Sequence, residues 1–349
     1  MTQALAIVAA VLAVSLLIVV HELGHFLAAR RFGMRVERFS VGFGPVLLSF
    51  RWAGTEWAIS ALPLGGYVKI AGMGPGEAED ASDRGLFANQ AAWRRFLVIL
   101  AGPTMNYLTA ILIAWALLAS IGLRAPDPGT RLGAPIPGMP AEAAGLRPGD
   151  RVASVAGKPV ETWDALVEEL QRRPGETIVL DVVRGEGPEA ARVAVPITPK
   201  DDGGVGRIGV ERGTVLVRVG AGEALVEGVR RTNANAAAQL AAFGSIFSKK
   251  QRVEGPVGIA RQLVRGARAG IEPFLGLVWT ISIVLAILNL LPVPALDGGR
   301  LVFLAYEIVA RRRVSEKVEG YVHFAGFVLL VGLLLAVTIF GDLPRLLGR

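Results

Sequence analysis

The segment His21-Glu22-Leu23-Gly24-His25 has the clearest capacity for chemistry in this chain. On a helix, residues four apart lie on the same face, so the imidazoles of His21 and His25 could bind one zinc ion. Glu22 lies near the same edge and could take a proton from a water molecule that the metal activates. Because the chain contains no cysteine, thiolate ligands are excluded and a further ligand must be His, Asp or Glu.

A second segment could complete such a metal site, because catalytic zinc usually has three protein ligands and one open position. Asp297 directly follows Pro292 and Pro294, which each lack an amide proton and interrupt helical hydrogen bonding. Broken helix at membrane depth is tolerated only where it is packed in protein or lines a wet cavity. We therefore expect Asp297 to be the third ligand. Other carboxylates near apolar segments lack a comparable break: Glu272, Glu307 and Glu319.

Four long apolar segments would place these residues in a membrane. The chain has 349 residues, 52% of them hydrophobic and 19% charged, and residues 4–20, 96–123, 273–296 and 322–340 contain no charged side chain. Each is near or above the ~17–25 residues that a helix needs to cross a bilayer. The first segment lacks the basic start and the small-residue cleavage site of a signal peptide, so we expect it to be retained. The predicted fold class is a multi-pass α-helical membrane protein with four transmembrane helices.

Basic residues predict the orientation of these helices. They cluster after the first segment, before the second, and between the third and fourth, and positive loops face the cytoplasm. Both termini and residues 124–272 would then be extracytoplasmic, in a bacterial inner membrane, with the active site toward the cytoplasmic side. The net charge of +7 is better explained by this topology and by anionic lipid headgroups than by nucleic acid. The basic residues are Arg30, Arg31, Arg35, Arg38, Arg94, Arg95, Arg300, Arg311, Arg312, Arg313 and Lys317.

Two regions between the helices have patterns of their own. Residues 31–92 form a cytoplasmic-side, membrane-associated β element and loop, with a hairpin turn at Trp52-Ala53-Gly54-Thr55. Residues 124–200 resemble one α+β PDZ domain, with a helix from Pro140, a turn at Arg147–Asp150 and a second helix capped by Thr162. Such a domain could bind an added strand or chain end at a sheet edge, or it could only block access or act as a spacer.

The remaining boundaries follow from these assignments. Residues 1–30 are the first transmembrane helix and 93–123 the second, 201–272 are a linker with amphipathic helices, and 273–299 are the third transmembrane segment. Residues 300–321 form a cytoplasmic loop, and 322–349 are the fourth helix and tail. We expect His323 to make an interhelical hydrogen bond or to lie at the interface. Pro103 and Asn106 are expected to shape the packing around the cavity, and Asn106 could also contact substrate.

The paired motifs H-E-x-x-H and N-x-x-P-x-P-x-L-D-G, at 21–25 and 289–298, resemble the site-2 protease family of intramembrane zinc metalloproteases, and most closely its bacterial RseP branch. Further matching stretches, such as Gly42-Phe43-Gly44-Pro45, extend the resemblance through essentially the whole chain. That branch commonly has two tandem PDZ domains, and this chain has room for one. The resemblance implies that Zn²⁺ is held by His21, His25 and Asp297, that Glu22 is the general base, and that Asn289 binds substrate backbone.

By the same resemblance, the substrates are transmembrane helices of single-span proteins, such as trimmed anti-sigma factors or remnant signal peptides, and the β element presents them as extended strands. For Asn289 a helix-capping role is the alternative, since an amide serves either purpose. Two other functions remain to be weighed. A catalytically silent membrane scaffold would use only its PDZ domain, and would need neither Glu22 nor the paired motif. A metal transporter would need a second polar path through the helices.

Overall fold

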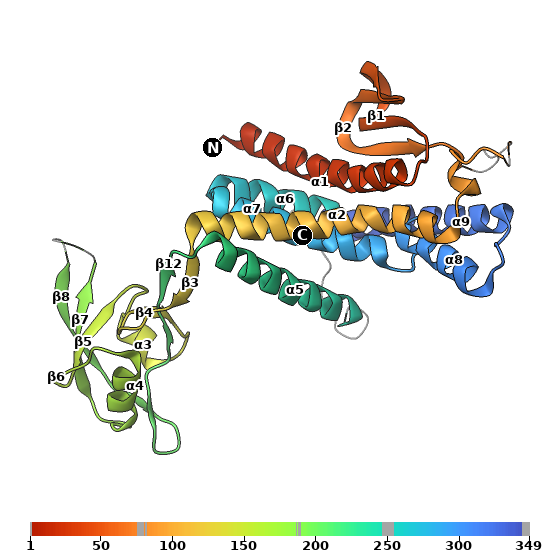
Figure 1. Cartoon of the computed structure of the whole chain (residues 1–349). Coiled ribbons are helices and arrows are strands. Elements are labelled where there is room, and N and C mark those ends of the chain that lie inside the picture. The colour runs from red at the N-terminus through yellow and green to blue at the C-terminus, as the bar shows by residue number, and fades with distance from the viewer. Residues whose placement is uncertain are drawn as a thin grey trace. The chain divides into compact units, whose positions relative to one another are not determined.

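The computed structural model describes residues 2–74, 80, 82–185, 187, 190–245 and 255–343, and its chain divides into two compact units. One unit contains residues 1–118 and 221–349, and the other contains residues 119–220. Figure 1 shows the first as mostly long helices and the second as short strands with small helices. The helices of the first unit are α1 (Gln3–Arg31), α2 (Ala92–Ile121), α5 (Ala221–Ser245), α6 (Pro256–Ala269), α7 (Ile271–Leu290), α8 (Asp297–Ala310) and α9 (Glu316–Ala336), with a short 3₁₀-helix at Phe87–Asn89 and a π-helical continuation of α9 at Val337–Asp342.

Four helical segments in the described residues are long and apolar enough to cross a membrane, which fits the four predicted spans. They are Gln3–Arg31, Ala92–Ile121, Ile271–Leu290 and Lys317–Asp342. The last begins earlier than residue 322, because the Ser315 hydroxyl accepts a hydrogen bond from Val318 and caps α9. The predicted tail after residue 343 and most of the predicted loop at 74–82 lie outside the described residues.

Small residues let α1 and α2 approach closely beside the H-E-x-x-H segment. A Cβ atom on Gly24 would lie 2.3 Å from the carbonyl oxygen of Ala101, so only glycine allows the backbones this contact. Close approach through small residues is the usual basis of helix packing in membranes, where burial of apolar surface provides little drive. The backbone of α2 therefore lies directly against the turn of α1 that contains the histidines.

The predicted hairpin is present as β1 (Val36–Trp52) and β2 (Thr55–Ile70), which lie beside α1 (Figure 1). Its turn has φ 50° at Ala53 and 81° at Gly54, the two left-handed positions that a two-residue hairpin turn requires. Both strands bend, so residues 38–41 pair with 56–59 on one side and with 66–69 on the other. This arrangement makes residues 66–69 an edge of the small sheet.

The third transmembrane segment differs from the prediction, which extended it to residue 299 and placed a loop at 300–321. Helix α7 ends at Leu290, the chain crosses to Asp297 without helical structure, and α8 then continues to Ala310. Pro292 and Pro294 interrupt the helix, as expected. The residues after them carry apolar side chains at helical spacing, and Leu301 and Leu304 are buried. That burial explains why residues 300–310 are helix rather than loop.

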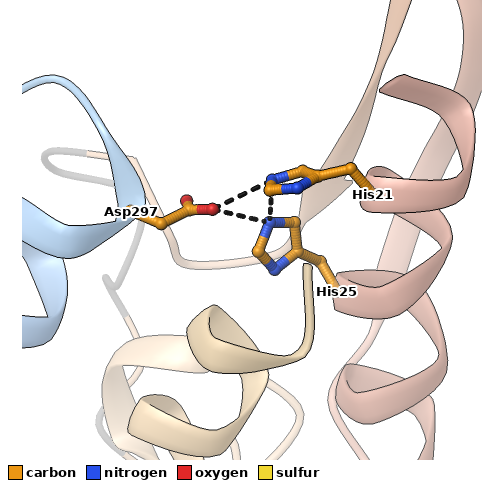
Figure 2. Close-up of side chains that lie close together, drawn as sticks. All are labelled: His21, His25 and Asp297. Carbon is orange, nitrogen blue, oxygen red and sulfur yellow. Dashed lines mark hydrogen bonds and ion pairs between the residues drawn. The ribbon is translucent and has the colours of Figure 1, made fainter. Parts of the chain in front are cut away.

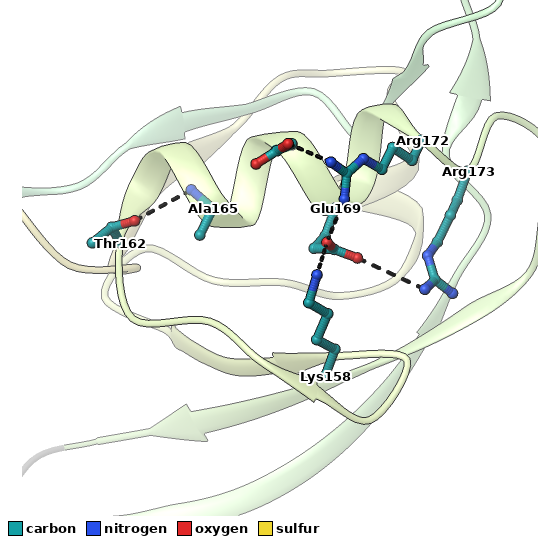
Figure 3. Close-up of polar contacts among 7 residues, drawn as sticks. Lys158, Thr162, Ala165, Glu169, Arg172 and Arg173 are labelled. Carbon is teal, nitrogen blue, oxygen red and sulfur yellow. Dashed lines mark hydrogen bonds and ion pairs between the residues drawn. The ribbon is translucent and has the colours of Figure 1, made fainter.

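The second unit contains a four-stranded antiparallel sheet in the order β6-β5-β7-β8, with helices α3 (Pro140–Ala143) and α4 (Trp163–Gln171). As predicted, Thr162 caps α4, and its hydroxyl accepts from the Ala165 amide at 3.3 Å (Figure 3). The sheet strands are β5 (Arg151–Val155), β6 (Lys158–Pro159), β7 (Ile178–Arg184) and β8 (Ala191–Ile197), and the others are β3 (Leu123–Pro126), β4 (Leu132–Pro135), β9 (Lys200–Asp201), β10 (Gly206–Arg207), β11 (Val210–Arg212) and β12 (Thr214–Val217).

The predicted boundary of this unit at residue 200 was too early. Strand β11 pairs with β4, and β12 pairs with β3, so residues 210–217 return to the start of the unit. The stretch assigned to a linker therefore begins with strands of the same unit, which extends to Gly220. The amphipathic helices predicted after it are α5 and α6.

Candidate metal centre

Three donor atoms from α1 and α8 converge on one point (Figure 2). Nε2 of His21 lies 2.9 Å from Oδ2 of Asp297, and Nε2 of His25 lies 3.4 Å from the same oxygen. The two Nε2 atoms are 3.1 Å apart. The histidines are four residues apart on one face of α1, and Asp297 is the first residue of α8, so the break after α7 brings its carboxylate to them.

The spacing of these atoms fits a single divalent cation. Zinc binds histidine nitrogen and carboxylate oxygen at about 2.0–2.1 Å in a tetrahedron, which places ligand atoms about 3.3 Å from one another. Oδ2 of Asp297 is buried and makes no hydrogen bond among the described residues. A buried carboxylate oxygen facing two ring nitrogens needs a positive partner, and a metal ion provides one.

Hydrogen bonds on the far side of each ring fix how the histidines face this point. Nδ1 of His25 donates to the Val98 carbonyl at 2.8 Å, which leaves Nε2 with a free lone pair. Nδ1 of His21 lies 3.3 Å from the side-chain amide of Asn106, a residue only 1% exposed. Oδ1 of this amide has no partner within the described residues. An amide flip, which exchanges Oδ1 and Nδ2, would let Oδ1 accept from Nδ1–H of His21.

Asn106 and Gly102 are two positions of α2 whose relation to the histidines the sequence did not reveal. Asn106 was expected to shape the packing around the cavity or to contact substrate; it lines the cavity described below and also lies against His21. A Cβ atom on Gly102 would lie 2.4 Å from Nε2 of His25 and 2.8 Å from Nε2 of His21, so any side chain there would displace both rings. The available signal was a single asparagine and a Gly-Pro pair in an otherwise apolar segment.

Glu22 is held by the hairpin. Its Oε2 accepts a hydrogen bond from the Val68 amide of β2 at 3.0 Å. The strand follows α1 toward this point, because the Ser15 hydroxyl donates to the Pro63 carbonyl and Gly66 packs near Val19. Glu22 is therefore fixed beside the three converging donor atoms by a backbone donor.

A cavity of about 310 Å³ joins these residues. His21, Glu22, Asn289 and Asp297 all line it, together with residues of the hairpin and of α7. Among the described residues the Asn289 side chain makes no hydrogen bond, and the helix after the break has no side-chain cap. The cavity therefore contains four of the five predicted site residues, and Nε2 of the fifth, His25, lies 3.1 Å from Nε2 of His21.

His323 lies outside the three-atom cluster and supports it indirectly. Its Nδ1 accepts a hydrogen bond from the Ala295 amide at 2.9 Å, two residues before Asp297. Ala295 has φ 74°, an unfavourable conformation for alanine that this bond helps to hold. Gly326 packs against Pro294 so closely that a Cβ atom would lie 2.3 Å from the proline ring. The hydrogen bond of His323 is therefore made to the loop before Asp297 and not, as had been expected, to another helix.

Comparisons with known proteins agree with this arrangement. The model of peptidase family M50 matches residues 9–333. Three bacterial relatives that bear the name "Putative zinc metalloprotease" match over nearly their whole length. The one from Mesorhizobium japonicum is 34% identical and covers 91% of this chain and 93% of its own. That from Agrobacterium fabrum is 32% identical (98% and 96% covered), and that from a Nostoc species is 34% identical (94% and 93% covered). The chain therefore belongs to peptidase family M50, the site-2 protease family, and is a metalloprotease.

Proposed function

We propose that this protein is an intramembrane zinc endopeptidase that cuts peptide bonds within the transmembrane helices of single-span proteins. Zinc is its metal, since the donor set suits zinc and the relatives are named for it. The observation that carries the proposal is the convergence of His21, His25 and Asp297 within helices long enough to cross a membrane. Ionisable groups at membrane depth are costly and usually functional.

The charge distribution supports an orientation for this enzyme. The histidines lie in the second half of α1, whose last turn contains Arg30 and Arg31. By the positive-inside rule that end faces the cytoplasm, so the active site lies toward the cytoplasmic side of a bacterial inner membrane. Both termini and residues 119–220 would then be extracytoplasmic.

In the proposed mechanism Glu22 moves the proton. When bound, zinc supplies Lewis acidity that polarises the scissile carbonyl and makes water acidic. Glu22 takes the proton from the attacking water and delivers it to the leaving amide nitrogen. Val68 holds one carboxylate oxygen by its amide, which leaves the other oxygen for this transfer. Asn289, across the cavity, would hold the substrate backbone through its amide.

The edge of the small sheet suits an unwound substrate. A helix buries its carbonyls in internal hydrogen bonds, so it must open before water can attack, and in a membrane the freed groups need new partners. Val68 directs its amide away from β1 and toward Glu22, and the two-residue repeat places the backbone groups of Gly66 on the same edge. Gly66 also lines the cavity, so a substrate strand added there would lie beside the metal centre.

Residues 119–220 suit a PDZ domain that binds an extracytoplasmic chain end. Helix α4 and residues 206–210 enclose an apolar cavity of about 250 Å³, with Leu166 and Ile208 in its wall. An extended peptide could bind in such a groove by adding a strand. We propose trimmed anti-sigma factors and remnant signal peptides as substrates, because each would present one transmembrane helix and a free chain end.

The decisive experiment compares the purified wild type with Glu22→Gln on a reconstituted single-span substrate. Gln keeps the size and the bond to Val68 but cannot carry the proton, so the variant should retain one zinc ion per chain and lose cleavage. Asp297→Ala should lose both zinc and cleavage. Equal cleavage by Glu22→Gln and the wild type would refute the general-base role. Full complementation of a deletion strain by Asp297→Ala would favour the silent scaffold.

A further inference from the structure

A second cavity, of about 240 Å³, lies between the starts of α2 and α9 and one face of α8. It is separate from the cavity that contains the metal ligands, and the two share no lining residue. Three arginines line it, Arg95, Arg300 and Arg313, together with the carboxylates of Glu307 and Glu319. The arginines come from three different parts of the chain, so the fold itself collects this positive charge.

Two of the arginines, Arg95 and Arg313, pair with the carboxylate of Glu307. Arg95 is buried, with 7% of its side chain exposed, and its guanidinium donates to Glu307. Nε of Arg313 lies 3.6 Å from the other oxygen of Glu307, and Nη2 donates to the Ala88 carbonyl at 2.6 Å. A single carboxylate thus offsets two guanidinium groups, and Arg95 also donates through Nε to the Gln90 carbonyl at 3.0 Å.

Two other donors at the cavity have no acceptor. Arg300, which is partly buried, makes no hydrogen bond or ion pair with any described residue. Nε2 of His323 is buried and also has no hydrogen-bond partner in the described part of the chain. Since Nδ1 of this ring accepts from Ala295, Nε2 carries the hydrogen and is a donor. The nearest carboxylate oxygen, of Glu319, is 3.9 Å away, too far for a hydrogen bond.

Unpaired donors of this kind call for an acceptor-rich anion. Buried polar groups are nearly always hydrogen-bonded, so a cavity with surplus N–H groups is incomplete by itself. A phosphate group offers several strong acceptor oxygens, and arginine matches its geometry with paired donors. The apolar side of the cavity, with Phe303 and Val314, would accept the carbon attached to such a phosphate.

We propose that this cavity is a binding site for a phosphate group, carried by an anionic phospholipid headgroup or by free phosphate. Its place at the ends of two membrane helices is where headgroups lie, and basic pockets between helix ends are known to hold them. Arg300 and His323 are the donors that the ligand satisfies. Because His323 also holds Ala295, the bound anion contacts the side chain that supports the loop before Asp297.

Binding is measured directly on the purified full-length protein. Native mass spectrometry counts retained phosphatidylglycerol, with phosphatidylcholine as the lipid control, and titration calorimetry measures inorganic phosphate. Arg300→Gln should weaken binding about tenfold or more, which is the loss in affinity expected when one charge-assisted hydrogen bond is removed. The matched control is Arg312→Gln. Arg312 is exposed and precedes Arg313 but does not line the cavity, so this variant loses the same charge and should bind like the wild type. Glu319→Gln removes a negative charge from the cavity wall and should tighten binding.

The outcomes separate the two sources and the null result. Retention of phosphatidylglycerol alone identifies a headgroup site, and binding of inorganic phosphate as well identifies a site open to the free anion. The proposal is overturned if neither ligand binds, or if Arg300→Gln binds as well as the wild type. It is equally overturned if Arg300→Gln and Arg312→Gln weaken binding to the same extent, because that pattern is general surface attraction. The zinc content and unfolding temperature of each variant show whether it is folded, and Glu319→Gln provides the test if Arg300→Gln is not.

Discussion

The Val68 amide donates to the Glu22 carboxylate at 3.0 Å, and this bond connects the β hairpin to the turn of α1 that carries both histidines. It has two consequences for catalysis. It fixes one carboxylate oxygen of the proposed base, and it shows that the edge of β2 faces the candidate metal centre. The hairpin is therefore part of the site rather than an appendage to it.

Val68→Pro should disable cleavage while leaving zinc in place. Proline removes the amide that Glu22 uses, and it interrupts no bond to β1 because that amide points away from the partner strand. A hydrogen bond to a charged group contributes about 1.5–3 kcal/mol, so we expect kcat to fall about tenfold or more. Val68→Ala, which changes the side chain but keeps the amide, is the control and should cleave nearly normally. Similar rates for the proline and alanine variants would show that the bond has no catalytic value.

Asn106→Leu should weaken zinc binding even in the absence of substrate. The Asn106 amide lies against Nδ1 of His21, and partners of metal-bound histidines typically contribute 10–100-fold to metal affinity. Asn106→Asp keeps an acceptor and should restore much of the affinity. Competition with a chelator gives the zinc affinity of each variant. If zinc affinity is unchanged and only KM rises, Asn106 contacts substrate, as the sequence had left open.

The convergence of His21, His25 and Asp297 could be predicted because its signals are local. The His21 and His25 spacing is a property of one helix turn, and the prolines before Asp297 mark a break without any knowledge of the fold. The hairpin was likewise predictable from a turn dipeptide between two apolar strands. In each case a few neighbouring residues are enough to indicate the feature, without any contact to a distant part of the chain.

The remaining features depend on contacts between distant parts of the chain. Asn106 and His21 are 85 positions apart, so nothing in either helix alone indicates their contact. Likewise β12 pairs with β3 across the whole second unit, which is why its end was predicted too early. The helix after Asp297 is not evident from the sequence because its basic residues suggest a loop, whereas burial of Leu301 and Leu304 decides the structure.

Asp342→Ala should loosen helix α6 without altering the metal centre. The carboxylate accepts from the amides of Gly255, Val257 and Gly258 at 3.0–3.2 Å, and so caps the start of α6. Loss of such a cap costs about 1–2 kcal/mol. Hydrogen exchange of the α6 amides should become correspondingly faster, while zinc content stays constant. Asp342→Asn retains an acceptor and is the control; equal exchange in Asp342→Ala and the wild type would show that the cap is not needed.

Acid should loosen helix α4 in the second unit through Glu169. Its buried carboxylate accepts from Lys158 and lies near Arg172 and Arg173 (Figure 3), and the bond from Lys158 is the main cause that lowers its pKa. A carboxylate with a lowered pKa in the folded state stabilises above its unfolded pKa of about 4.3, and this contribution disappears as the pH falls toward the folded value. Hydrogen exchange of the α4 amides should therefore show a smaller free energy of opening at pH 3 than at pH 7. Glu169→Gln should remove most of this pH dependence, whereas Glu168→Gln, an exposed control that also pairs with Arg172, should preserve it. An unchanged pH dependence in Glu169→Gln would assign the effect to another group.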